Sequence, residues 1–556
     1  MRAIATLRSA IVVVCPIALL FGPGCADTPD EEQEEQAEIA ARADANSIPA
    51  IIDIRRSLAV IDLPTLDAVD DSGARRFSLK KVLTQLAATS GAPQASAAAL
   101  YKRIFDTNNT KAQGFVADGQ HCDDEKDANG NPVLNGFPIQ CPRQEGVLAD
   151  TSLHDPFCSG AGCDPYSPVA ITNRFDLAPE NGRTCGQYRI VFGKGTGGQT
   201  PVATAGNKVP FDRNLLIFEA VLPNPKPHRG LAGCAPVVEF WAGLSAVSSP
   251  ALRAKALSRF FFKGLPGFEP ALDFSHFTGA VHPQSGVQLS GQIRTNQFMF
   301  AVGQQAWQLR EYNLHRACPG HNKPCVGKVK LVTSKVNPSA SLFDDGDTSA
   351  AALAFRDQSD PAAFLGQIAS LAANDVNQIN MNGLSPEFNI GQSTSSPKFN
   401  SPVLNDTNYN LLFNPGGAFA AKIQTRLNAI GSALTPTEIV RRAQTQSCAG
   451  CHELSTSTAL GFGGVAGANQ LGGGLVWPDD ANGSPAVGSL PGFSQTTEVN
   501  LQPIDPASGV TCDPSCTANP ATCKCEWMIS PALIDVFLPA RRDGMAAFLA
   551  SLPHNH

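Results

Sequence analysis

The stretches QYRIVFG (residues 187–193) and NLLIFEAVLP (residues 214–223) decide the fold expected for the middle of the chain. Both are short apolar runs bounded by Gly, Pro or Asn, which is typical of strands buried in a sheet. VVEFWAGL (237–244) and KVKLVTS (328–334) have the same character. We therefore predict a mostly β domain over residues 166–345.

Helical signals lie on both sides of this domain and once inside it. LKKVLTQLAATSG (79–91) ends on a glycine, and ALRAKALSRFFF (251–262) interrupts the strands. PAAFLGQIASLAANDV (361–376) and GAFAAKIQTRLNAIG (417–431) carry apolar residues three and four positions apart. This spacing places apolar side chains on one face of a helix, so helices are predicted in all four segments.

The N-terminus has the pattern of an export signal. Arg2 and Arg8 precede an apolar run from Ala10 to Phe21, which is too short to span a bilayer and suits a signal peptide. The sequence GPGC that follows resembles the end of a bacterial lipoprotein signal. Cys25 is therefore the expected lipid attachment point, and plain secretion is the alternative. We expect the chain in the periplasm or outer membrane, with this anchor as its only membrane contact.

The net charge of −7 comes from one short segment. Between Asp27 and Asp44 there are eight acidic residues and one basic residue, which together account for −7. Such a segment is expected to be a solvated, disordered tether behind the anchor. The rest of the chain is nearly neutral and has no basic stripe, so no nucleic-acid partner is expected.

The chain has 16 cysteines, and 12 remain once the export segment and the motif described below are set aside. An even set in an exported chain predicts up to six disulfides. Their positions suggest the pairs Cys122–Cys141, Cys158–Cys163, Cys185–Cys234 and Cys318–Cys325. The last four cysteines, in CDPSCTANPATCKC (512–525), are expected to form disulfides, with a zinc or iron–sulfur site as the alternative. Spacing alone leaves the connectivity open.

Charged residues are scattered through the β-rich region, without a nucleophile elbow, a phosphate loop or paired metal-binding histidines in the sequence. They either line a substrate site or form surface and buried ion pairs that set the fold, and their spacing does not choose between these. The residues are Arg174, Asp176, Glu219, His276, Arg294, Arg310 and Glu311.

A helix is predicted near the C-terminus, in TPTEIVRRAQTQSCAGCHEL (435–454). Thr435 is a good N-cap and Pro436 suits the first helical position. Glu438 is placed to complete a capping box with Thr435. The helix should therefore run from Pro436 into the cysteine pair.

Cys448, Cys451 and His452 form a C-x-x-C-H motif in this segment. Two thiols at this spacing can bond both vinyl groups of one haem, and the adjacent histidine then supplies the proximal nitrogen to the iron. A zinc site lacks a nearby second ligand cluster and a redox dithiol lacks a βαβ setting, so both are weaker alternatives, as is chance. The expected cofactor is one covalently attached haem c.

Residues 435–552, about a fifth of the chain, resemble a bacterial c-type cytochrome domain. The motif is followed by a glycine-rich segment, LGFGGVAGANQLGGGLVWPDD (460–480), and by a closing helical piece, SPALIDVFLPARRDGMAAFLASL (530–552). The resemblance implies a distal iron ligand, for which Met528 is the first candidate. Met545, a histidine or an open position are the alternatives.

Four further residues have two interpretations each. Their side chains either contact the haem propionates or have ordinary roles, as packed indoles and solvated guanidinium groups. These residues are Trp477, Trp527, Arg441 and Arg442.

The expected fold class is multidomain α+β, with a loop- and disulfide-rich, mostly β N-terminal and central region followed by a small all-α cytochrome c-like domain. We expect an exported monohaem lipoprotein that transfers single electrons and whose large N-terminal part binds a redox partner protein or a substrate. A haem oxidase or peroxidase and a surface binding or structural lipoprotein are the alternatives. The expected regions are 1–24 (signal peptide), 25–48 (tether), 49–165 (helical, then cysteine-rich loops), 166–345 (β-rich), 346–432 (helical) and 433–556 (haem domain).

Overall fold

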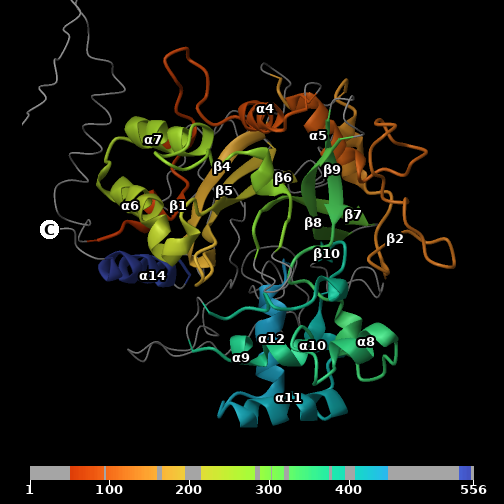
Figure 1. Ribbon diagram of the computed structural model, residues 1–556. Helices are drawn as coiled ribbons and strands as arrows, with labels where there is room; N and C mark the ends of the chain where they lie inside the picture. Colours follow the sequence, from red (N-terminus) through yellow and green to blue (C-terminus); the bar gives the residue numbers. More distant parts are fainter. Residues whose placement is uncertain are drawn as a thin grey trace, which may run out of the picture. The chain divides into compact units, whose positions relative to one another are not determined.

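The computed structural model describes most of the chain between residues 51 and 552 (Figure 1). The described ranges are 51–92, 95–153, 155–158, 166–194, 214–281, 288–301, 304–318, 325–374, 378–394, 407–448 and 537–552. The predicted signal peptide, the lipid attachment residue Cys25 and the acidic tether lie outside these ranges.

The described part is an α+β fold built on an antiparallel sheet of eight strands, as expected for the β-rich region. The strand order is β1-β4-β5-β6-β7-β8-β10, and β9 pairs with β8 outside this path. A separate two-stranded hairpin joins β2 and β3. The strand bounds are β1 Ala59–Val60, β2 Val133–Leu134, β3 Phe137–Pro138, β4 Tyr166–Arg174, β5 Thr184–Lys194, β6 Asn214–Pro223, β7 Gln292–Ala301, β8 Gln304–Ala317, β9 Val326–Val332 and β10 Ser393–Thr394.

The two stretches that were expected to decide the fold form β5 and β6, and these strands pair with each other in the centre of the sheet. Their alternation places Tyr188 and Phe218 on one face of the sheet, where both are fully buried. Tyr188 stacks on Trp241 with ring centroids 5.5 Å apart and meets Phe260 edge to face at 4.9 Å. This face of the sheet therefore carries the aromatic core.

VVEFWAGL was predicted as a strand, and this prediction is wrong. The segment lies in helix α6 (Ala235–Gly243), which begins with a proline in its first turn. Val237, Val238, Trp241 and Ala242 are buried in it, and they follow a helical spacing. A short apolar run does not distinguish a buried helix from a buried strand, because neither shows polar residues on a fixed period.

The helix predicted in ALRAKALSRFFF is confirmed as α7 (Pro250–Phe262). It packs beside α6 through Phe260, whose ring stacks on Phe240. Helix α4 (Leu79–Thr89) is confirmed as well, and Gly91 just beyond it has a positive φ of 65°. The other α-helices before β4 are α2 Ile54–Ser57, α3 Leu63–Leu66 and α5 Ala97–Asp106. The short 3₁₀ helices are η1 Gln144–Ala149, η2 Phe175–Leu177, η4 Pro227–Cys234, η5 Leu244–Ala246, η6 Phe274–Phe277, η7 Ala340–Phe343, η8 Phe364–Gln367 and η9 Pro386–Phe388.

A second group of helices follows β9 in the sequence, on both sides of the short strand β10. Its members are α8 Ala350–Phe355, α9 Ile368–Leu371, α10 Tyr409–Leu412, α11 Ala418–Ala429 and α12 Pro436–Gln446. Helices α8, α10 and α11 share an aromatic cluster centred on Phe343, whose ring contacts Phe355 at 5.0 Å, stacks on Tyr409 at 4.3 Å and lies 6.2 Å from Phe419. Helix α11 confirms the prediction for residues 417–431.

The single helix predicted over residues 361–376 is only partly correct. The chain forms the 3₁₀ helix η8 and then the short α9. Gly366 approaches the backbone of Pro361 so closely that a Cβ on it would lie 2.1 Å from the Pro361 oxygen. The Gln367 side chain donates to the same oxygen at 2.9 Å. Because of this close approach, the segment begins as a 3₁₀ helix, whereas its apolar spacing predicts an α-helix.

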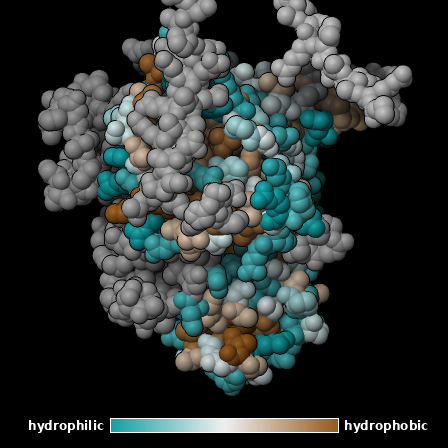
Figure 2. Space-filling view, turned by 60° about the vertical axis from the view of Figure 1, so that its left-hand side comes forward, coloured by the Kyte–Doolittle hydropathy of each residue, from teal (hydrophilic) through white to brown (hydrophobic). Residues whose placement is uncertain are grey.

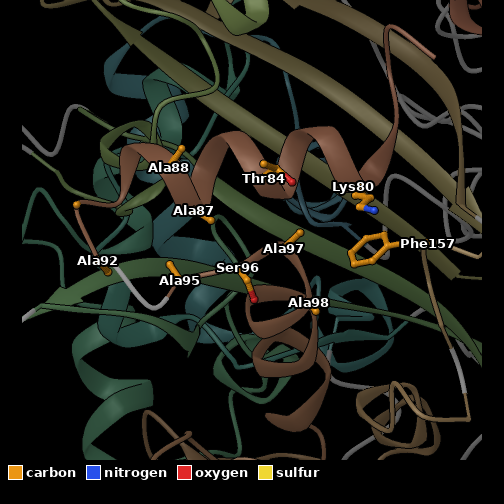
Figure 3. Close-up of a pocket in the computed structure, with 11 residues that line it drawn as sticks. Lys80, Thr84, Ala87, Ala88, Ala92, Ala95, Ser96, Ala97, Ala98 and Phe157 are labelled. Atoms are coloured by element: carbon orange, nitrogen blue, oxygen red, sulfur yellow. The ribbon is translucent and has the colours of Figure 1, made fainter. Parts of the chain in front are cut away.

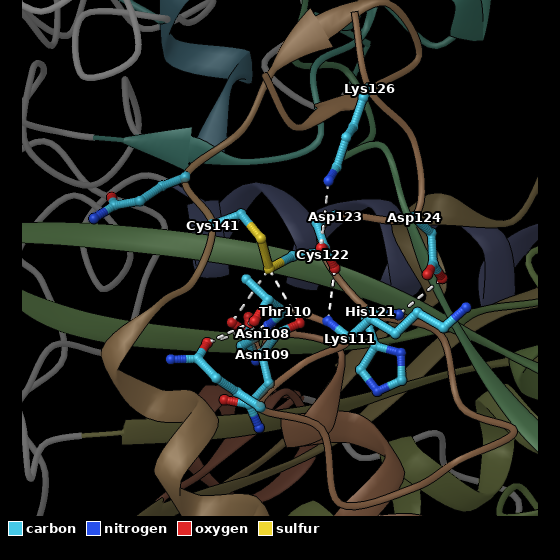
Figure 4. The surroundings of a disulfide bond; sticks show 12 residues. Asn108, Asn109, Thr110, Lys111, His121, Cys122, Asp123, Asp124, Lys126 and Cys141 are labelled. Carbon is cyan, nitrogen blue, oxygen red and sulfur yellow. Dashed lines mark hydrogen bonds and ion pairs between the residues drawn. A yellow bond between two sulfur atoms is a disulfide. The ribbon is translucent and has the colours of Figure 1, made fainter. Parts of the chain in front are cut away.

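Three predicted disulfides are confirmed, namely Cys122–Cys141, Cys185–Cys234 and Cys318–Cys325. The first disulfide closes a loop beside Asn108 and Asn109 (Figure 4). The second joins β5 to the start of α6. The third bridges the two ends of the β8–β9 connection. Cys158 is also disulfide-bonded. Its predicted partner Cys163 and the cluster at 512–525 lie outside the described residues.

In the described part of the chain, no helix has the length and apolar character that crossing a membrane requires. On the visible face, hydrophobic residues lie among hydrophilic ones (Figure 2). The large exposed hydrophobic side chains come from well-separated positions, such as Leu153, Leu353 and Leu411.

Candidate functional site

Helix α12 leads into the C-x-x-C-H motif and begins as the sequence predicts. The Thr435 hydroxyl accepts from the Glu438 backbone N–H at 3.3 Å, and Glu438 Oε2 accepts from the Thr435 backbone N–H at 2.6 Å, which completes the capping box. Cys448 follows two residues after the end of the helix and is half-buried with a free thiol. Cys451, His452 and Met528 lie outside the described residues, as do Trp477 and Trp527.

The C-terminal end of α12 is linked to the edge of the sheet through α10. Gln444 accepts from the Asn410 backbone N–H at 3.1 Å and from its side chain at 2.9 Å. Thr407, just before α10, donates to the Thr394 carbonyl of β10 at 2.8 Å, and Thr394 lies opposite Gln308 of β8. These bonds connect the last turn of α12 to β8, and the upper end of α12 lies toward β10 (Figure 1).

Arg442 has a structural role in α12. Its guanidinium is buried and donates from Nη1 to the Leu371 carbonyl at 2.8 Å and to the Ala373 carbonyl at 3.1 Å. Burial lowers its pKa to about 10, although Glu438 opposes this change. The interpretation of Arg442 as a solvated guanidinium group is therefore wrong, since this side chain is buried and holds α12 to the C-terminal end of α9. Its contact with a haem propionate stays a prediction.

Replacing Arg442 with methionine should lower the free energy of unfolding by about 2–3 kcal/mol, because two buried carbonyls lose a charged donor while the apolar stem is retained. Chemical denaturation followed by circular dichroism would measure this loss. The neighbouring Arg441→Met is the matched control and should change stability by less than about 1 kcal/mol. Equal losses in the two variants would contradict the anchoring role of Arg442.

A row of charged and polar side chains crosses the face of the sheet opposite the aromatic core. Arg189 of β5 lies opposite Glu219 of β6, and Glu219 lies opposite Gln292 of β7. Arg294, two residues further along β7, lies opposite Glu311 of β8. Because side chains two apart share a face of a strand, these five residues lie on one side of the sheet. We call them, together with Lys335, the charged row.

The members of the charged row are bound to one another. Arg189 Nη1 lies 3.2 Å from Glu219 Oε1, and Arg294 Nε lies 3.4 Å from Glu219 Oε2 and 3.1 Å from Glu311 Oε2. Gln292 donates to Glu219 Oε2 and accepts from Lys335 Nζ at 2.6 Å. Both carboxylates have side chains only 1% exposed, so these contacts replace water around them.

The pKa values in the charged row follow from burial and from these pairs. Burial lowers the pKa of Lys335 to about 8 and that of Arg189 to about 10, although the nearby carboxylates oppose both shifts. Burial also opposes the charge on Arg294, but Glu219 and Glu311 outweigh it and raise the Arg294 pKa. For Glu219, burial is outweighed by Arg189 and Arg294, and its pKa is lowered.

Residues of the charged row affect the pKa of Cys448, the first cysteine of the motif. Burial raises the pKa of the Cys448 thiol; Arg294 opposes this shift, while Glu311 and Glu219 reinforce it. The thiol in turn acts on the pKa of Arg294. The pKa of Cys448 therefore depends on three residues of the scattered charged set, Glu219, Arg294 and Glu311.

Helix α14 (Leu538–Ser551) reaches the same sheet near the end of β4. Its Arg541 Nε lies 3.6 Å from Asp176 Oδ2, and Asp176 is also held by Arg174, whose Nη2 donates at 2.9 Å. The pKa of Asp176 is lowered because Arg174 and Arg541 outweigh its burial, with a further contribution from Arg189. Met545 is buried, and its sulfur lies 3.5 Å from the Asn173 amide nitrogen.

The remaining two residues of the scattered set lie elsewhere. His276 Nδ1 lies 3.0 Å from the Ala271 carbonyl, and its Nε2 lies 3.3 Å from Glu269. Arg310 is on the other face of β8, where its Nη1 donates to Asn108 Oδ1 at 2.8 Å beside the Cys122–Cys141 loop. Burial lowers the Arg310 pKa to about 9. Both residues hold loops in place.

Sequence reasoning missed three members of the charged row, Arg189, Gln292 and Lys335. Arg189 had a detectable signal, because it is the single charged residue in QYRIVFG, as Glu219 is in NLLIFEAVLP. A lone charge in a buried strand needs a partner, and a neighbouring strand is the place to find it. Lys335 lies beyond the end of β9 and gives no such signal.

The described structure also has a groove of about 830 Å³ between α4 and α5 (Figure 3). Alanine residues form much of its lining, with Lys80, Thr84 and Phe157 at its sides. These side chains include no metal ligand and no acid–base pair. Within the described ranges, no three His, Cys, Asp or Glu side chains are grouped to hold a metal ion.

The chain was also compared with known proteins. Protein-family models, curated protein sequences and solved structures give no match to it. The functional conclusions therefore depend on the motif and on the residues around it.

Proposed function

We propose that the chain is an exported c-type cytochrome with one haem, which transfers single electrons. In this proposal Cys448 and Cys451 hold the haem through thioether bonds, and His452 is the proximal iron ligand. Residues 433–556 would form a small helical haem domain. The observation that carries the proposal is the complete C-x-x-C-H motif directly after a helix whose capping box is formed.

The state of the described cysteines supports this use of Cys448. Seven of them, Cys122, Cys141, Cys158, Cys185, Cys234, Cys318 and Cys325, are in disulfides. Cys448 has a free thiol, which thioether formation requires. The chemistry of the site residues therefore fits a covalently attached haem. The bound haem would supply an iron that changes oxidation state by one electron.

The other parts of the proposal concern location and ligation. Disulfides are consistent with an oxidising compartment, and we propose the periplasm or outer membrane with a lipid on Cys25. Met528 is proposed as the distal iron ligand. Met545 of α14 is buried and its sulfur contacts the side chain of Asn173, which favours a packing role for Met545. The large N-terminal part would bind the redox partner protein or a substrate.

A pyridine haemochrome spectrum and an intact mass test the proposal. The full chain is expressed with the cellular machinery for haem attachment and purified under denaturing conditions. The expected result is a c-type haemochrome band and a mass that exceeds the polypeptide and its lipid by one haem. A mass explained by polypeptide and lipid alone, without Soret absorbance, would refute the proposal. Carbon monoxide binding to the reduced protein would favour an oxidase or peroxidase over an electron carrier.

A further inference from the structure

The charged row is an unusual lining for the face of a central sheet. Three cations, Arg189, Arg294 and Lys335, accompany two carboxylates, Glu219 and Glu311. Buried ion pairs of this kind give little stability compared with apolar packing, because the desolvation of each charge offsets its attraction to the partner. The row also has one positive charge in excess. A fold that needed only a core would not require these residues.

The charged row is connected to the cofactor motif by geometry. The last turn of α12 is bonded through Asn410, and through Thr407 and Thr394, to the β10–β8 edge. Glu311 of the row lies on β8, three residues along the strand from Gln308, which faces Thr394. The Cys448 thiol also contributes to the raised pKa of Arg294. The end of α12 is therefore linked to β8, the strand that carries Glu311 of the charged row.

The other flank of the proposed haem segment leads to the same region. Arg541 of α14 pairs with Asp176, and Asp176 lies within the electrostatic influence of Arg189. Arg189 also acts on the pKa of the Cys448 thiol. The described residues on both sides of the stretch 449–536 are thus linked to the charged row at different strands, α14 at Arg189 of β5 and the end of α12 at β8.

We infer that the charged row faces the haem attached at Cys448, and that Lys335 and Arg294 are positioning residues whose positive charges raise its reduction potential. A haem presents two anionic propionates, which the excess cation of the row would complement. A fixed positive charge disfavours the ferric state more than the ferrous state, because the ferric state has the larger positive charge. The inference rests on the proposed function.

Spectroelectrochemical titration of the purified holoprotein tests the inference. At pH 7, Lys335→Met should make the equilibrium constant for reduction about tenfold smaller, a fall of about 59 mV in midpoint potential for one electron. Lys335→Arg keeps the charge and should leave the potential unchanged. Lys330→Met removes an exposed lysine of the neighbouring β9 and is the matched control, with no expected shift.

A pH series distinguishes an electrostatic role from a merely structural one. The groups that face Lys335 are Glu311, Arg294, Glu219 and Arg189, and the pKa of Lys335 among them is about 8. The difference between wild type and Lys335→Met should therefore be present at pH 7 and absent at pH 10. A structural disturbance would persist at both values.

The outcomes separate the inference from the proposed function. A haemochrome spectrum is recorded first on each preparation. If wild type has no covalent haem, the proposed function itself is wrong. If haem is attached and Lys335→Met has the potential of wild type at pH 7, the charged row does not face the haem and the inference is overturned. Equal shifts in Lys335→Met and Lys330→Met would overturn it as well.

Discussion

Glu219→Gln should lower the free energy of unfolding by about 3–5 kcal/mol, the largest loss of stability expected from a single substitution in the sheet. The variant keeps the shape of the side chain but removes the carboxylate that Arg189 and Arg294 share. Both guanidinium groups are largely buried, so they would retain the cost of desolvation without their common partner. Urea denaturation followed by circular dichroism would measure the change.

Glu180→Gln provides the matched control. Glu180 lies on an exposed turn before β5, and its replacement should change stability by less than about 0.5 kcal/mol. The effect of Glu219 should also depend on pH. Its pKa is lowered in the folded state from 4.5, so its contribution is fully present above that value and is lost as the pH falls through the lowered pKa. A loss below about 1 kcal/mol at pH 7 would contradict the pairing described for the row.

The combined variant Cys448→Ser and Cys451→Ser should lose all covalently attached haem. A hydroxyl does not form the thioether bonds that hold the porphyrin, so denatured protein should show no c-type haemochrome band. The disulfides at Cys122–Cys141, Cys185–Cys234 and Cys318–Cys325 do not involve these residues, and the circular dichroism of the sheet should remain.

The control for this variant is Cys318→Ser with Cys325→Ser, which removes the same number of cysteines. That disulfide closes a loop with a sequence separation of only 7, between β8 and β9, away from the motif in the sequence. The control should keep one haem per chain. Covalent haem in the Cys448 and Cys451 variant, or its loss in the control, would show that the motif is not the attachment site.

The sequence was sufficient for those features that depend on neighbouring residues. The capping box of Thr435 and Glu438, the helix that closes before Gly431 and three disulfide pairs all follow from local chemistry. The run at 237–244 was misassigned because Glu239 is its only charged residue, and the other exposed position, Gly243, does not mark a polar face in the sequence. The turn at Gly366 depends on a close backbone approach that apolar spacing does not reveal.

The charged row could be predicted only in part. Glu219, Arg294 and Glu311 stood out as charges in a β-rich region, but the row exists because the strand order and register place them opposite one another. Register is a property of the assembled sheet, and a shift of one residue would send each side chain to the other face. The mutual influence of Cys448 and Arg294 on their pKa values has the same origin, because α12 and β7 are far apart in the sequence.

The pairing of Arg541 with Asp176 has a consequence for the order in which the protein matures. Helix α14 also contacts β4 through Met545, whose sulfur lies 372 residues along the chain from its partner Asn173. A contact between residues so far apart in the sequence requires the closure of a long loop, which costs more entropy than the pairing of neighbouring strands. We therefore expect α14 to dock after β4, β5 and β6 have paired with one another.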